Sequence, residues 1–239
     1  ISHTVEEDDL VSVKLKNRQD YEIIGKSLAS LDSPEKVNGS ARFGIDAYVP
    51  NMIYGKIIGP PVRMWARVKS IDDSKAKGID GYIKTIPVNL PKQMGYLIES
   101  AAVVVASSFP AAMRAAQLVK VDWALPETPP VSSDDMAKHA RRLQQDPNAG
   151  ENFVLKGDIE KVAKSSQTQI SAEYHTEMVT HATLEPASAV AQQVDGDWHI
   201  YAGLQAGNVM RYFVSLLAGV TPDKVIFHPH HVGGGFGGK

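Results

Sequence analysis

Hydrophobic and polar residues follow strand-like and helix-like patterns over residues 21–123. The run Ala101–Ala106 is apolar throughout and therefore predicts a central strand. Ser107 and Ser108, followed by Pro110, predict the start of a helix over Pro110–Leu118. Asp72–Ser74 predict the cap of a short helix that ends at Gly78. Further strands are predicted at Arg42–Ala47, Met52–Gly59, Ala66–Ile71, Tyr82–Val88 and Val119–Trp123.

A second patterned stretch follows a proline-rich linker at Ala124–Val131 and a polar helix at Asp134–Gln145. The turn Asp195-Gly196-Asp197 lies between two strand-like runs and predicts a hairpin. Helices are predicted at Asp158–Lys164 and Ala206–Leu217, and strands at Thr168–Thr176, Ala187–Val194, Trp198–Ala202 and Lys224–His231. Strands and helices alternating at this spacing indicate an α/β or α+β fold.

Composition excludes several classes of protein and site. The chain has 239 residues, of which 43% are hydrophobic and 22% charged, with a formal net charge of −2. This charge, without any basic cluster, argues against nucleic-acid binding. The absence of cysteine excludes disulfides, thiolate zinc sites, iron–sulfur ligation by this chain and a cysteine nucleophile.

Both ends of the sequence suggest a piece of a longer polypeptide, or a chain that needs a partner to complete it. It begins at Ile1 without a methionine, and its first 23 residues resemble a charged tail with one strand-like stretch at Leu10–Leu15. It stops at Lys239, directly behind a run of glycines. Such a run loses backbone entropy when it is ordered, which favours a role in placing something beyond it.

The strongest local signal is Gly233-Gly234-Gly235-Phe236-Gly237-Gly238-Lys239. Closely spaced glycines let backbone N–H groups approach an anion without interference from Cβ atoms. The spacing fits the front of a P-loop and also a dinucleotide fingerprint, but both require a following helix. The embedded phenylalanine favours a shaped, functional loop over a plain flexible turn.

Other candidate residues have a functional and a purely structural interpretation. Gln205 lies where a strand is followed by a helix, a common place for a ligand-facing side chain, although an amide there can also cap local backbone. The segment Thr180–Pro186 is either a functional polar loop or a surface turn. The histidines of His228–His231 lack a nearby carboxylate as a third ligand, so no metal site is predicted there.

An ordered set of motifs resembles one known family. It begins with Gly25, then Leu31-Asp32-Ser33-Pro34-Glu35-Lys36-Val37, and continues with Gly39, Ala41 and Phe43-Gly44-Ile45-Asp46. Thr180-His181-Ala182-Thr183-Leu184-Glu185-Pro186, Gln205 and Val232–Lys239 complete it. Together these residues resemble the molybdopterin-binding large subunit of the xanthine dehydrogenase/aldehyde oxidase family, in its isoquinoline 1-oxidoreductase-like and bacterial aldehyde dehydrogenase branch. The resemblance covers residues 21–239.

The resemblance implies an α+β architecture and a division into domains. It implies an N-terminal tail at 1–23, an a/b hammerhead domain at 24–125, a linker with helices at 126–164 and the start of a molybdopterin-binding domain at 165–239. The implied chemistry is molybdenum-dependent oxidation of an aldehyde or N-heterocycle, with water as the source of oxygen. The implied cofactor is molybdopterin in its cytosine dinucleotide form.

The resemblance also implies roles for individual residues. Gln205 resembles the glutamine that hydrogen-bonds an oxo ligand of the metal, and Phe236 resembles a loop residue near the substrate. Gln205 and the loop backbone at Gly234, Gly235, Phe236 and Gly237 are therefore expected beside the cofactor, in one cavity. No residue of this chain is expected to ligate the metal directly.

The family's general base lies far toward its C-terminus and is absent from this sequence. We therefore expect that this chain alone neither turns over substrate nor holds molybdenum. Implied partners are the remainder of the large subunit, a small [2Fe-2S] subunit and, in this branch, a cytochrome c subunit. A periplasmic location is implied by relatives that carry twin-arginine leaders, with a cytoplasmic one as the alternative. The residues also leave open a P-loop nucleotide hydrolase and a non-catalytic interaction domain.

Overall fold

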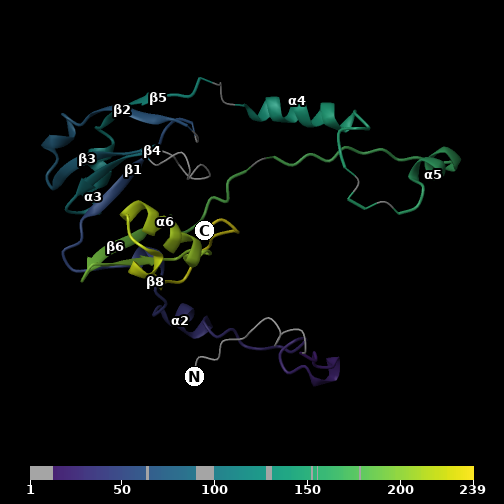
Figure 1. The fold of residues 1–239 in the computed structure, drawn as a ribbon, viewed down its shortest axis with the longest axis horizontal. Coiled ribbons are helices and arrows are strands. Elements are labelled where there is room, and N and C mark those ends of the chain that lie inside the picture. The colour runs from purple at the N-terminus through teal and green to yellow at the C-terminus, as the bar shows by residue number, and fades with distance from the viewer. Residues whose placement is uncertain are drawn as a thin grey trace. The chain divides into compact units, whose positions relative to one another are not determined.

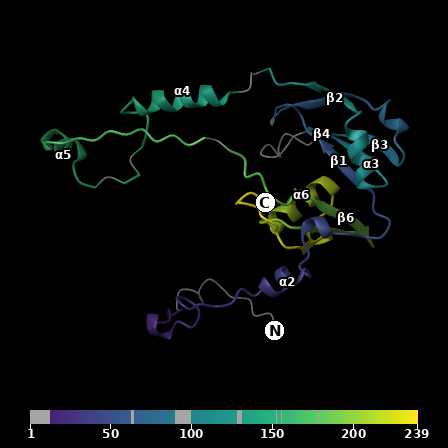
Figure 2. The ribbon, with the colours of Figure 1, turned by 180° about the vertical axis from the view of Figure 1, so that it is seen from behind.

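A computed structural model describes residues 13–62, 65–89, 100–127, 131–151, 153–154, 156–177 and 179–239. The chain forms two compact units, shown as ribbons in Figures 1 and 2. One unit is Tyr48–His181, and the other combines the segment that ends at Ala47 with Ala182–Lys239. The first of these units is therefore an insertion within the second.

The unit at 48–181 contains a three-stranded antiparallel sheet in the order β1-β4-β3. Its central strand β4 is almost wholly buried, which confirms the central strand predicted from its unbroken apolar run. Helix α3 buries Ala111, Ala112 and Ala115, and it begins where the Ser108 hydroxyl accepts a hydrogen bond from the Ala111 N–H at 3.4 Å. The bounds are β1 Tyr54–Ile58, β3 Tyr82–Asn89, β4 Ser100–Ala106 and α3 Phe109–Ala116.

A second, two-stranded sheet and two further helices complete this unit. Strands β2 (Arg67–Asp72) and β5 (Lys120–Ala124) pair antiparallel. Helix α4 (Ser133–Gln144) begins at a capping box of Ser132 and Asp135, and α5 (Ile159–Ser165) follows further along the chain. The short helix predicted to end at Gly78 is a single 3₁₀ turn at Ala76–Gly78.

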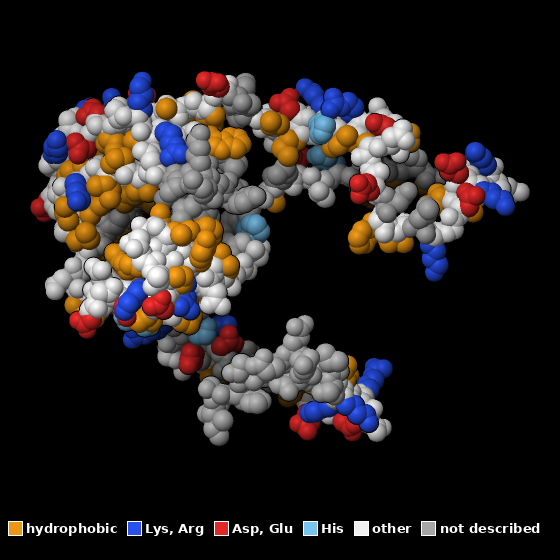
Figure 3. Space-filling model, in the orientation of Figure 1, with side chains coloured by type: hydrophobic (Ala, Val, Ile, Leu, Met, Phe, Trp, Pro, Cys, Tyr) orange, Lys and Arg blue, Asp and Glu red, His pale blue; other side chains and the backbone are white. Residues whose placement is uncertain are grey.

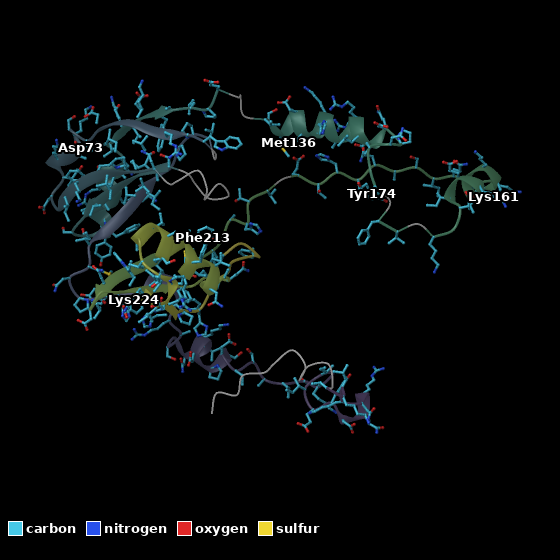
Figure 4. The ribbon with its side chains drawn as sticks, viewed as in Figure 1. Asp73, Met136, Lys161, Tyr174, Phe213 and Lys224 are labelled. Atoms are coloured by element: carbon cyan, nitrogen blue, oxygen red, sulfur yellow. The ribbon has the colours of Figure 1, made fainter. Side chains whose placement is uncertain are left out.

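The strand predicted at Thr168–Thr176 is wrong, because the structure has no regular element there. Ile170 and Tyr174 are 92% and 90% exposed, and Figure 4 shows Tyr174 on this extended segment. The alternating pattern is present, but no strand within the described residues pairs with it, and an unpaired strand is not stable. Residues 10–12 of the strand-like stretch at Leu10–Leu15 lie outside the described residues, and residues 13–15 form no regular element.

The other unit contains the sheet β6-β7-β8. Strands β6 (Ala189–Val194) and β7 (Asp197–Ala202) form the predicted hairpin, with Asp195 at φ 51° and Gly196 at φ 89°. Strand β8 (Val225–Pro229) pairs parallel to β7, and the connection between them runs through α6 (Gly207–Ala218) and a 3₁₀ turn at Pro222–Lys224. This connection is long enough to join two parallel strands through a helix, as a β-α-β crossover requires.

The segment that ends at Ala47 also belongs to this unit. It contains a 3₁₀ turn at Arg18–Asp20, helix α2 (Ser33–Asn38) and a 3₁₀ turn at Gly44–Asp46. The strand predicted at Arg42–Ala47 is therefore wrong. The Asp46 carboxylate accepts a hydrogen bond from the Phe43 N–H at 2.9 Å, which favours a local turn over a strand. Among the residues of this segment that the structure describes, the one β-bridge is isolated and pairs Phe43 with His231.

The compact units divide the chain at other positions than the boundaries implied by the resemblance. Residues 24–47 lie with residues 182–239, whereas the resemblance placed them with the hammerhead domain. The structure establishes a mixed helix and strand fold, and the hammerhead domain stays a prediction. None of the helices within the described ranges is both long and apolar enough to cross a membrane.

Candidate functional site

The glycine-rich segment forms a shaped loop directly after β8. Its backbone turns repeatedly through the left-handed region, with Gly234 at φ 65°, Phe236 at φ 49° and Gly237 at φ 91°. The Gly238 N–H donates to the Gly235 carbonyl at 2.9 Å and closes a turn. The Phe236 side chain is 70% exposed at the tip of this turn. A phenylalanine held at positive φ is strained, and such strain is concentrated at functional sites.

Four successive N–H groups of this loop are available to a ligand. Within the described part of the chain, no hydrogen bond engages the N–H groups of Gly234, Gly235, Phe236 or Gly237. A Cβ atom at Gly234 would lie 2.9 Å from the Leu184 Cβ, so a larger residue does not fit there. Successive N–H groups in a backbone of alternating hand form an anion-binding concavity.

Gln205 lies against this loop, as expected from the sequence. Its backbone N–H donates to the Lys239 carbonyl at 2.9 Å, and its side-chain Oε1 accepts from the Lys239 N–H at 3.4 Å. Strands β7 and β8 run parallel, so Gln205 and the loop follow neighbouring strands at the same edge of the sheet. Figures 1 and 2 show the C-terminus next to α6, which begins just after Gln205. The role of Gln205 toward a cofactor stays a prediction.

Glu185 is the buried charged residue at the base of the loop, and it is 8% exposed. Its Oε1 accepts from the Ile45 N–H at 3.1 Å, and its Oε2 accepts from the Gly233 N–H at 2.7 Å and from the Lys239 ammonium. Burial raises the pKa of this carboxyl, but the hydrogen bonds from Lys239, Gly233 and Ile45 outweigh burial and hold the pKa below its ordinary value. Glu185 stands in the Thr180–Pro186 motif, but no sequence pattern predicted a role for it.

The position of Lys239 argues against a P-loop. Its side chain is 5% exposed and is paired with Glu185, whose side chain is 7% exposed. A P-loop lysine must instead reach the phosphates of a bound nucleotide. The Lys239 ammonium instead forms an ion pair with the Glu185 carboxylate of the same chain.

Three glycines allow close packing around the Glu185 carboxylate. A Cβ atom at Gly203 would lie 2.4 Å from the His231 carbonyl oxygen. A Cβ atom at Gly44 would lie 2.9 Å from the Gly203 nitrogen, and one at Gly233 would lie 3.0 Å from Glu185 Cβ. Backbone segments far apart in sequence therefore meet here at distances that only glycine permits.

A groove of about 600 Å³ lies beside the loop within the same unit. Its apolar wall consists of Phe43, Ile45, Leu184, Pro186 and Val232, and Lys36, Glu185, Gly233 and Gly234 complete the lining. Its apolar lining with one buried charge resembles the lining of small-molecule sites.

The histidines form a stacked group on the sheet and not a metal cluster. The His199 Nδ1 and His228 Nε2 atoms are 2.9 Å apart, and the His228 ring stacks on Tyr201 with centroids 4.4 Å apart. Burial lowers the pKa of His228, and neighbouring His199 and His230 lower it further. Among the residues that the structure describes, no group of three or more histidine, aspartate or glutamate side chains could hold a metal ion.

Comparison with known proteins identifies relatives along nearly the whole chain. A model of the molybdopterin cofactor-binding domain matches residues 144–239. The membrane-bound aldehyde dehydrogenase [pyrroloquinoline-quinone] of Gluconacetobacter polyoxogenes is 34% identical over 99% of this chain. The isoquinoline 1-oxidoreductase subunit beta of Brevundimonas diminuta is 32% identical over 95% of this chain. This chain covers 30% and 29% of these two proteins.

A solved structure supports the fold. The crystal structure of quinoline 2-oxidoreductase from Pseudomonas putida 86 matches 89% of this chain and 31% of its own, with a TM-score of 0.63 and 21% identity. Residues 144–239 thus match the molybdopterin cofactor-binding domain, and the chain as a whole is similar to relatives named as an aldehyde dehydrogenase and an isoquinoline 1-oxidoreductase subunit, of which it spans about 30% of the length.

Proposed function

We propose that this chain forms part of the cofactor-binding wall of a molybdenum hydroxylase, which oxidises an aldehyde or N-heterocycle. The observation that carries the proposal is the contact between Gln205 and the loop. Gln205 hydrogen-bonds Lys239 while four neighbouring N–H groups face no partner among the described residues. The matched molybdopterin cofactor-binding domain includes both parts of this site.

The donor set fits an oxygen-rich and sulfur-rich cofactor. The N–H groups of Gly234–Gly237 would donate hydrogen bonds to it, and the Gln205 side-chain NH₂ group would add one more donor, since its Oε1 already accepts from Lys239. The Phe236 ring, which is exposed at the tip of the loop, would border the substrate. When bound, the molybdenum cofactor supplies the two-electron redox centre for the hydroxylation.

The overall reaction balances as substrate C–H plus water giving C–OH, two protons and two electrons. This chain orients the cofactor and holds no general base, which the proposal assigns to the remainder of the large subunit. The electrons leave through a small [2Fe-2S] subunit and then a cytochrome c subunit. The isoquinoline 1-oxidoreductase relative is named as a subunit, which supports a multi-subunit assembly.

The first experiment determines the cofactor of the full-length protein, meaning the complete polypeptide that contains this chain. We expect stoichiometric molybdenum by elemental analysis, and CMP released from a cytosine dinucleotide pterin. This chain expressed alone is expected to hold no molybdenum, because most of the cofactor-binding backbone of the family lies outside it. The name of one relative includes pyrroloquinoline quinone. Full-length protein with bound quinone and without molybdenum would therefore contradict the proposal.

Replacing Gln205 with alanine is expected to lower kcat of the full-length enzyme about 10- to 100-fold, because the cofactor loses one oriented donor. Steady-state kinetics with the enzyme's aldehyde or N-heterocycle substrate measure this loss, alongside molybdenum content. Gln193→Ala is the matched control, because Gln193 is an exposed glutamine on β6 of the same sheet. An unchanged kcat in Gln205→Ala enzyme with full molybdenum content would remove Gln205 from the site.

A further inference from the structure

We propose that the buried ion pair of Glu185 and Lys239 positions the cofactor loop and, through it, the Gln205 amide. The inference rests on the proposed function, because it adds to that site two residues that act through others. Glu185 and Lys239 are therefore positioning residues and not catalytic ones.

A single carboxylate oxygen holds both ends of the loop. Glu185 Oε2 accepts from the Gly233 N–H at 2.7 Å, where the loop begins, and from the Lys239 ammonium, where it ends. Between these residues the described structure contains one internal backbone hydrogen bond, from Gly238 to Gly235. The position of the intervening N–H groups therefore depends on how the two ends are held.

The second carboxylate oxygen fixes Glu185 itself. Glu185 Oε1 accepts from the Ile45 N–H at 3.1 Å, and the N–H groups of Leu184 and Glu185 donate to the Gly234 and Gly233 carbonyls at 2.9 Å. Three segments that are distant in sequence are thus joined at one side chain. A positioning group must itself be held in one geometry, and these bonds provide that.

Lys239 transmits this position to Gln205. While its ammonium pairs with Glu185, its backbone carbonyl accepts from the Gln205 N–H and its backbone N–H donates to Gln205 Oε1. The second of these bonds orients the amide so that its NH₂ group is left for a ligand. Displacing Lys239 would therefore rotate or free the Gln205 amide.

The test uses full-length holoenzyme with Glu185→Gln, which keeps the side chain's shape and removes its charge. We expect kcat to fall about 10- to 100-fold, the range found when groups behind a cofactor's direct contacts are changed. We also expect the Mo(V) electron paramagnetic resonance signal to shift, because the hydrogen bonds to the cofactor change. A purely structural role would lower the amount of folded enzyme but leave the spectrum of the loaded fraction unchanged.

Glu35→Gln is the matched control. Glu35 lies in the same unit, its carboxylate is 3.3 Å from His231 Nε2, and its side chain is 60% exposed. We expect this variant to keep the wild-type spectrum and kcat. Glu185→Gln enzyme that is indistinguishable from wild type in spectrum and kcat would overturn the inference.

If the Glu185→Gln variant does not fold, the double variant Glu185→Gln/Lys239→Met tests the inference in its place. It leaves no unpaired charge buried, so we expect it to fold, with a lowered kcat and a shifted Mo(V) signal. A double variant with the wild-type signal and kcat would overturn the inference. The two charges would then compensate each other without any effect on the cofactor loop. Failure of the proposed function is visible separately, as wild-type protein without molybdenum.

Discussion

Replacing Lys239 with methionine is expected to destabilise the unit formed by the segment ending at Ala47 and residues 182–239 by about 3–5 kcal/mol at pH 7. The substitution leaves the Glu185 carboxylate buried without its countercharge, with two N–H donors as its remaining partners. Hydrogen exchange of the β7 and β8 amides, followed by mass spectrometry in the full-length protein, measures the loss as faster opening of these strands.

The destabilisation by Lys239→Met is expected to shrink as the pH falls. In the wild-type protein the pKa of Glu185 lies below its ordinary value, so this group contributes stability above that value and loses it as the pH falls through the folded pKa. Without Lys239, the pKa of Glu185 loses the largest of the contributions that lower it and rises relative to the wild type, so the variant loses less stability than the wild type as the pH falls. Repeating the exchange measurement at pH 7 and pH 5 tests the sign.

Lys224→Met is the control for this prediction. Lys224 forms an ion pair with Asp197 at 2.9 Å in the same unit, but its side chain is 52% exposed. Water already solvates such a pair, so its loss should have a much smaller effect. Equal effects of the two substitutions would show that burial of the Glu185–Lys239 pair has no energetic importance.

Replacing Gly203 with alanine is expected to cost about 3 kcal/mol or more, because the new methyl group overpacks the sheet edge. Its Cβ would lie 2.4 Å from the His231 carbonyl oxygen, so backbone and not a flexible side chain must move. Since His231 lies two residues before the loop, we also expect molybdenum content to fall. Soluble yield, hydrogen exchange at β8 and elemental analysis check these outcomes.

Gly59→Ala is the control for Gly203→Ala, because no atom of the described residues lies within 4 Å of a Cβ built at Gly59. It makes the same chemical change in open space, so it should leave exchange and molybdenum content at wild-type values. Full stability of Gly203→Ala would mean that the edge of β7 and the chain after β8 are not packed as described.

Much of the fold could be predicted because its signals are local. The unbroken apolar run at Ala101–Ala106, the Asp195-Gly196 turn and the Ser108 cap each specify an element through neighbouring residues. The wrong predictions concern two segments whose residue pattern resembles a strand but which are not paired as strands in the structure. Thr168–Thr176 has a strand pattern without a partner strand in the described residues, and Arg42–Ala47 turns because of the Asp46 side chain.

The candidate site was predictable in part. Gln205 and the glycine loop follow neighbouring parallel strands, and both stand out in the sequence as a strand–helix junction and a glycine run. Glu185 has no such signal, because its partner Lys239 lies 54 residues away and its other partners are backbone groups. Neither periodicity nor motif spacing in the sequence indicates a contact between two residues so far apart. Apolar side chains on the surface were not predicted either, and Figure 3 shows them at several places on the visible face. On α6, Val209, Tyr212 and Leu216 are about half exposed.

The interrupted unit has a consequence for biosynthesis. Tyr48–His181 is continuous in sequence, so its sheets can form as soon as that stretch has left the ribosome. Ile45 can form its hydrogen bond with Glu185 only after residue 185 has been translated. Phe43 can form its bridge with His231 only after residue 231 has been translated. Ala41 and Ala47, which are buried in the folded unit, stay uncovered during translation of the inserted stretch, so we expect holdase chaperones to bind the nascent polypeptide upstream of residue 48.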